Sequence, residues 1–125
     1  MQFAVVVAFS LGAQQVPARK GQELFQQALV KERAQGKLED AIQLYQQVIR
    51  EFASDRPLAA KAWLQVGRCY QKLGKPEARQ VYERILRDYA DQREAAKQAR
   101  RALRDLRPTG DPPSAKSDAI KGSGG

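Results

Sequence analysis

Four polar side chains near the middle of the chain have types and spacings suited to holding an acidic partner. They are Lys61, Gln65, Arg68 and Lys72, separated by 4, 3 and 4 residues. On an α-helix this spacing places all four side chains on one face. Ammonium, guanidinium and amide groups in such a row can hold an acidic or extended peptide through charge-assisted hydrogen bonds. The alternative is a helix face that only water contacts.

A second set of cations lies closer to the C-terminus. Its members, also at helical spacing, are Arg93, Lys97, Arg100, Arg101 and Arg104. Such a stripe could follow the phosphates of a nucleic acid or the headgroups of an anionic membrane. The same stretch has no aromatic residue to stack on bases or to anchor in a membrane. Nucleic acid is therefore an unlikely partner. The alternative to a binding role is a helix face that only water contacts.

Catalytic chemistry has little support in this composition. The chain has no His and one Cys, Cys69, so this thiol has neither an imidazole to activate it nor a second thiol for an internal disulfide. The acidic residues, Glu32 among them, are scattered between Lys and Arg as in exposed surface pairs. Residues 67–75 have the wrong spacing for a phosphate-binding loop. We therefore predict no enzyme activity, no metal site and no cofactor.

Helices must position these side chains, and the apolar residues recur at the intervals of three and four that predict them. We expect helices over residues 19–34, 38–52, 76–89 and 91–106. A further helix should begin after the capping candidates Ser54 and Asp55, with Pro57 in its first turn, and end at Leu73. Gly36 and Gly74 are predicted to cap the helices that precede them.

The helices over 38–52 and 76–89 carry the same pattern. Ala41, Tyr45, Val48, Phe52 and Ala53 return as Ala78, Tyr82, Ile85, Tyr89 and Ala90, each 37 residues later. A fixed period of this length indicates a repeat array. Because a row of antiparallel helices buries the apolar stripe of each member, the sequence predicts an all-α fold, an α-solenoid of two helical hairpins and a C-terminal capping helix.

The stretch from Ala62 to Leu86 resembles a tetratricopeptide repeat. That family pairs an aromatic, a Leu-Gly step and a Tyr on the first helix of a repeat with an Ala and an aromatic on the second. Those roles fall here to Trp63, Val66, Gly67, Tyr70, Gly74, Ala78 and Tyr82, while Gly36, Ala41 and Tyr45 match the later half of the preceding repeat. The first helix of that preceding repeat lacks the Trp and the Leu-Gly step.

The resemblance implies a scaffold that binds proteins without catalysis. The first helix of each repeat lines the inner groove of such a solenoid, so it implies that Lys61, Gln65, Arg68 and Lys72 face this groove. The repeat endings EFASD and RDYAD are most similar to those of bacterial periplasmic members of the family, of the Tol-Pal-associated type. Trp63, Tyr45, Tyr70 and Tyr82 are expected in the core.

The chain divides into three predicted parts. Residues 1–17 read as a secretory signal and linker, residues 18–107 as the helical domain, and residues 108–125 as a Pro/Gly/Ser-rich linker or tail. The apolar run from Phe3 to Ala13 has the length of a signal core and is shorter than the roughly 20 residues that span a bilayer. No Lys or Arg precedes this run, and an apolar extension that packs on the first helix is the alternative.

The formal net charge of +8 favours acidic partners, although it also serves solubility. We predict a non-catalytic protein-interaction scaffold, exported to the bacterial periplasm or secreted, that could be the N-terminal part of a longer protein. A cytoplasmic location is the alternative. The alternative function is that of a basic adaptor that binds nucleic acid or anionic membrane through its last helix.

Overall fold

Residues 19–106 are the part of the chain that the computed structural model describes, and they form only helices and turns. A helix over 19–29 continues into the π-helical turn η1 (Val30–Ala34), followed by α2 (Leu38–Glu51), α3 (Arg56–Lys72), α4 (Glu77–Asp88) and α5 (Arg93–Asp105). The predicted all-α fold of five helices is confirmed. The predicted signal and tail lie outside the described residues.

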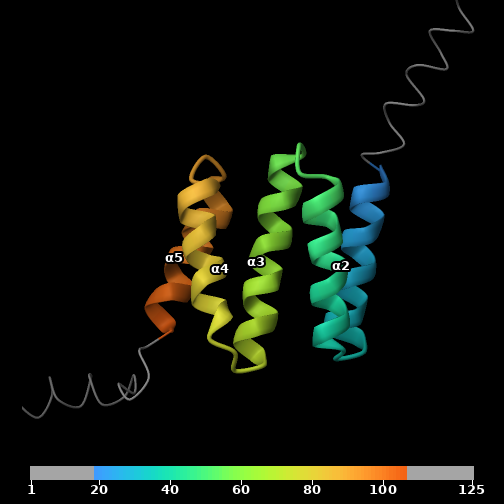
Figure 1. Ribbon diagram of the computed structural model, residues 1–125, viewed down its shortest axis with the longest axis horizontal. Coiled ribbons are helices and arrows are strands. Elements are labelled where there is room, and N and C mark those ends of the chain that lie inside the picture. The colour runs from blue at the N-terminus through green and yellow to red at the C-terminus, as the bar shows by residue number, and fades with distance from the viewer. Residues whose placement is uncertain (1–18, 107–125) are drawn as a thin grey trace, which may run out of the picture.

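The helices alternate between two layers (Figure 1). Each packs on its neighbour in the chain, and α3 also contacts α5. We call the layer formed by the first helix, α3 and α5 the α3 layer, and the layer formed by α2 and α4 the α2/α4 layer. This zigzag lets every apolar stripe meet two neighbouring helices, as expected of a helical repeat array.

Local signals set the helix ends where they were expected. The Asp55 carboxylate accepts a hydrogen bond from the backbone N–H of Leu58 at 3.2 Å, and Pro57 lies in the first turn of α3. Gly36 and Gly74 have φ of +65° and +70°, a left-handed conformation that glycine adopts without steric cost. Each glycine therefore ends the helix before it and turns the chain back into an antiparallel hairpin.

The start of α5 differs by two residues from its predicted position. Residues between α4 and α5 form a turn in which the N–H of Gln92 donates to the carbonyl oxygen of Tyr89 at 2.9 Å. Arg56 holds this turn, because its Nη2 lies 2.5 Å from Asp91 Oδ1 and 2.7 Å from the carbonyl oxygen of Asp88. The guanidinium hydrogen bond keeps the pKa of Asp91 low, at about 2. The pair is exposed, so we expect it to orient the turn more than to stabilise the domain.

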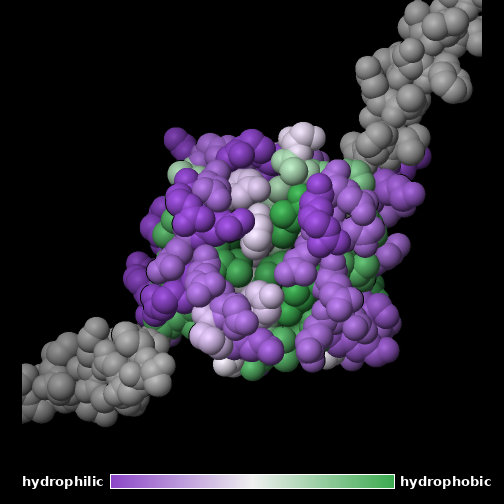
Figure 2. All heavy atoms as spheres, in the orientation of Figure 1, coloured by the Kyte–Doolittle hydropathy of each residue, from purple (hydrophilic) through white to green (hydrophobic). Residues whose placement is uncertain are grey.

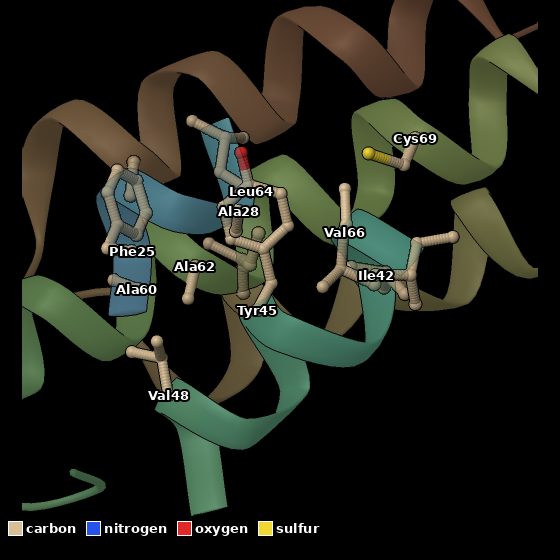
Figure 3. Close-up of a cluster of buried hydrophobic side chains, with 14 of the residues drawn as sticks. Phe25, Ala28, Ile42, Tyr45, Val48, Ala60, Ala62, Leu64, Val66 and Cys69 are labelled. Atoms are coloured by element: carbon tan, nitrogen blue, oxygen red, sulfur yellow. The ribbon is translucent and has the colours of Figure 1, made fainter. Parts of the chain in front are cut away.

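Side chains from all the helices form one core. Figure 3 shows the part of it that the first helix, α2 and α3 contribute. Tyr45 and Tyr82, which occupy the same place in the two repeats, are both fully buried, and the ring of Tyr45 lies 5.4 Å from that of Phe25. Burial also raises the pKa of the Cys69 thiol to about 12, so this buried thiol is protonated at neutral pH. Trp63 and Tyr70 were expected in the core but are only half-buried, at its edge.

Gly67 lets α3 and α4 approach each other. A methyl group added to its Cα would lie 2.6 Å from Cε1 of Tyr82, closer than side-chain carbons pack. The hydroxyl of Tyr82 donates to Gln71 Oε1 at 2.8 Å, which fixes the ring across the glycine. The Leu-Gly-type step of the sequence thus marks a contact between helices.

Candidate functional site

A buried carboxylate lies where the first helix meets α2 and α3. Glu32, in η1, has a side chain only 2% exposed. Its Oε1 accepts hydrogen bonds from the hydroxyl of Tyr45 at 2.7 Å and from Nε2 of Gln65 at 3.1 Å, while its Oε2 accepts one from Nζ of Lys72 at 2.8 Å. These four residues, which we call the Glu32 cluster, join the first helix to α2 and α3.

The surroundings of Glu32 favour its charged form. Burial alone would raise the pKa of this carboxyl, but the hydrogen bonds from Lys72 and Tyr45 and the charge of Lys72 outweigh burial and lower it. Burial raises the pKa of the Tyr45 hydroxyl, which therefore stays protonated and donates. The cluster is an ion pair with two further hydrogen-bond donors, and it joins three helices.

The π-helical turn explains how an acidic side chain reaches this position. Tyr82 donates to Gln71, 11 residues before it, whereas the equivalent Tyr45 donates to Glu32, 13 residues before it. A π-helical turn holds more residues than an α-helical turn, so η1 takes up part of this extra length. The side chain of Glu32 in this turn thereby reaches the hydroxyl of Tyr45 on α2.

The expectation that Glu32 is exposed was wrong. Its position carried a signal, because it follows Ala28 by four residues and so continues the apolar stripe of the first helix. The side chain is charged, which made the stripe seem to end at Leu29. The partners of Glu32 come from other helices and could not be read from its neighbours in the sequence.

Hydrogen bonds extend from the Glu32 cluster along the α3 layer to α5. Gln65 Oε1 accepts from Nη1 of Arg68 at 2.8 Å, and Nη2 of Arg68 donates to Oε1 of Gln98. Gln98 in turn donates from Nε2 to Oε1 of Glu94 at 3.0 Å. Within residues 19–106, the hydrogen bonds of the half-buried Arg68 thus go to amide oxygens and not to a carboxylate.

The four residues predicted for a partner-binding groove all lie on α3, but their exposure differs. Lys61 is exposed, Arg68 is half-buried, and the side chain of Lys72 is 54% exposed although it pairs with Glu32. Gln65 is buried and held between Glu32 and Arg68. The three cations therefore have atoms that a partner could contact, whereas Gln65 positions Arg68. Their role in binding stays a prediction.

A hollow of about 330 Å³ lies where α3 faces α4 and α5. It brings Arg68, from the predicted groove, together with Arg101, from the predicted basic patch. The other residues that line it are Gln71, Tyr82, Glu94, Gln98, Ala102 and Asp105. The hollow thus combines two guanidinium groups with two carboxylates and two amides, which suits a polar segment of a partner.

The predicted basic patch covers the end of the array. Arg93, Lys97, Arg100, Arg101 and Arg104 are all exposed on α5, while the alanines Ala95, Ala96 and Ala99 are buried. Arg100 follows Trp63 by one repeat of 37 residues, so a cation stands where α3 has an aromatic side chain. A charged outer face of this kind is typical of a terminal, capping helix.

Over residues 19–106, acidic, Cys and His side chains nowhere gather in threes as a metal ion would need. In the same range, the helices are too short or too polar to cross a membrane.

The chain was compared with known families and proteins. Residues 32–103, more than half of the 125-residue chain, match the family model described as Tetratricopeptide repeat. The match begins in η1 and ends in α5. It therefore covers α2, α3, α4 and most of α5, but not the first helix before η1. No curated protein and no solved structure matches the chain.

Proposed function

Because this chain belongs to the tetratricopeptide repeat family, we propose that it is a non-catalytic scaffold whose α3 layer binds an acidic, extended segment of a partner protein. Repeats of this family generally mediate protein–protein interactions. The partner's charge and the binding face are inferred from the side chains of α3 and α5.

The proposal rests on the position and the hydrogen-bond partners of Arg68. Its guanidinium borders the hollow between α3 and α5, and its hydrogen bonds go to the amide oxygens of Gln65 and Gln98. A carboxylate is a stronger acceptor for a guanidinium than an amide is. An acidic side chain that enters the hollow could therefore replace Gln98 as the partner of Arg68, with Lys61 and Lys72 on the same helix adding attraction.

A labelled ten-residue peptide of alternating Glu and Ser would test the proposal by fluorescence anisotropy. We expect it to bind the full chain, and we expect Arg68→Gln to weaken binding about tenfold or more, since a charge-assisted hydrogen bond contributes about 1.5–3 kcal/mol. Lys61→Glu, at an exposed position of α3, should also weaken it. The matched control is Arg50→Gln, an exposed position on α2, which should leave the affinity unchanged. Equal binding of a Lys/Ser peptide would contradict the proposal.

The exposed cations of α5 favour one other function, that of an adaptor for nucleic acid or anionic membrane. Binding of single-stranded DNA or of phosphatidylserine vesicles would then fall steeply between 50 and 200 mM salt. It would also be lost in Arg100→Glu/Arg104→Glu, which leaves Arg68 in place. That outcome, without binding of the acidic peptide, would replace the scaffold proposal.

We also propose export to the bacterial envelope, by analogy with periplasmic members of the family of the Tol-Pal-associated type. The support is the apolar run from Phe3 to Ala13, which lies outside the described residues. Mass spectrometry of the protein after expression and fractionation in a bacterial host should find a new N-terminus near Ala13 in the periplasm. An intact Met1 in the cytoplasm would contradict export and would strengthen the adaptor alternative.

A further inference from the structure

An apolar groove runs along α3 on the side that faces away from the Glu32 cluster. Its floor consists of Trp63, Val66, Tyr70 and Leu73, and α2 and α4 form its walls. Two hollows of about 450 and 250 Å³ make up the groove and meet at Tyr70. Figure 2 shows it as a green and white strip between the purple side chains of the α2/α4 layer. We call it the α2/α4 groove.

The dimensions of the α2/α4 groove suit a short helix. From Trp63 to Leu73 its floor extends over about 15 Å, at roughly 1.5 Å per helical residue. A helix of three turns has that length. The floor is apolar, and the walls carry amide side chains from α2 and α4, namely Gln43, Gln46 and Gln80. A helix with one apolar and one polar face matches this arrangement.

The two ends of the α2/α4 groove differ in charge. The hollow at the Leu73 end is lined by Glu39, Lys75 and Glu77, a formal sum of −1. The hollow at the Trp63 end is lined by Glu83, Arg84, Arg87 and again Glu77, which borders both hollows, a formal sum of 0. The N-terminus of a helix carries partial positive charge and its C-terminus partial negative charge. A bound helix is therefore favoured when it starts at the Leu73 end and ends at the Trp63 end, antiparallel to α3.

The two segments that flank the described residues in this sequence differ in chemistry from such a helix. Residues 1–18 contain no charged side chain, and residues 108–125 contain one large aliphatic side chain, Ile120. A second copy would present the same groove, and two grooves that face each other leave a gap where a ridge is needed. A helix of a partner protein is the occupant that fits the apolar floor and the charges of this groove.

We propose that the α2/α4 groove docks an amphipathic helix of a partner protein, with an aliphatic stripe, a basic first turn and an acidic last turn. The acidic turn lies against Arg84 and Arg87, and the aliphatic stripe covers Trp63 and Tyr70. Arg84 already stacks on Trp63, with Cζ 5.0 Å from the centre of the ring. The groove uses the side of α3 that faces away from Arg68 and the Glu32 cluster, so the protein would bind two segments on opposite sides of α3.

Trp63 provides the readout, because it is the chain's only Trp and lines the α2/α4 groove. The probe is a 14-residue peptide with blocked ends, Lys in its first turn, Leu at helical spacing and Glu in its last turn. The control peptide exchanges its Lys and Glu residues. Since Glu at the start and Lys at the end stabilise an isolated helix, the control is the more helical peptide. Tighter binding of the probe therefore cannot be due to helicity.

We expect the probe to shift Trp63 emission to shorter wavelength in a saturable way, and to bind at least fivefold more tightly than the control peptide. Arg87→Glu should weaken the probe at least fivefold and strengthen the control peptide. The matched variant is Arg50→Glu, which occupies the same place one repeat earlier and does not line this groove. It should change neither affinity, and Arg68→Gln should also leave the Trp63 signal intact.

Equal affinity for the two peptides, or no effect of Arg87→Glu, would overturn the proposal. A dimer that forms without peptide, shifts Trp63 emission and dissociates in Arg87→Glu would also overturn it, because a second copy would then occupy the groove. Loss of acidic-peptide binding alone would contradict the function of the α3 layer and leave the α2/α4 groove unaffected.

Discussion

The Gly67→Val variant is expected to melt about 10–20 °C below the unaltered protein. A β-carbon at this position would lie 2.6 Å from Cε1 of Tyr82, and the ring cannot move aside because it is fully buried and its hydroxyl is bonded to Gln71. Overpacking of this kind costs about 1–3 kcal/mol, and each 1 kcal/mol shifts the melting temperature of a small domain by about 4–8 °C. Circular dichroism at 222 nm during heating would measure the change.

Gly74→Ala is the control for this prediction. Gly74 has φ of +70°, and no atom lies within 4 Å of the methyl group that the substitution adds. Its cost is therefore limited to backbone strain of about 1 kcal/mol. A Gly67→Val protein that melts no lower than Gly74→Ala would show that α3 and α4 do not meet closely at Gly67.

Glu32→Ala is expected to lower the free energy of unfolding by about 2–3 kcal/mol at pH 7. The substitution leaves the buried Tyr45 hydroxyl and the Gln65 amide without their acceptor, which costs about 1–3 kcal/mol. Loss of the ion pair with Lys72 adds little to this cost, because the half-exposed amine can be solvated by water instead. Urea denaturation would measure the loss, with Glu23→Ala, at an exposed position in the same helix, as the control that stays within about 0.5 kcal/mol.

The effect of Glu32→Ala should depend on pH. The folded protein lowers the pKa of Glu32 below its usual value of 4.5, so the carboxylate stabilises the fold above that pH. This contribution is lost as the pH falls through the lowered pKa. The difference between the two proteins should therefore be smaller at pH 3 than at pH 7. A difference that is as large at pH 3 would contradict the assignment of a charged Glu32 to the core.

Several features of the fold were accessible from the sequence because they depend on neighbouring residues. Asp55 with Pro57, and a glycine after an apolar stripe, define helix ends locally. The repeat of Tyr45 as Tyr82 placed both rings in the core. The family-level resemblance to tetratricopeptide repeats is confirmed by the match over residues 32–103.

The candidate sites were less predictable because they depend on contacts between distant residues. Gln65 was grouped with three cations by its spacing, yet it is buried against Glu32, 33 residues away. Lys72 reaches the same carboxylate across 40 residues. Trp63 and Tyr70 follow the apolar stripe, but helical spacing does not tell which part of a stripe its neighbours leave uncovered. The α2/α4 groove emerges only when α2 and α4 are placed on either side of α3.

The burial of Cys69 limits disulfide formation in an oxidising compartment. Disulfide exchange requires an accessible thiolate, and this sulfur is both enclosed and protonated at neutral pH. Two folded copies would therefore not form a disulfide through Cys69, even where oxidants are abundant. Covalent pairs joined through Cys69 would form only from molecules that had opened, so their abundance in stored or exported protein would record how often the domain unfolds.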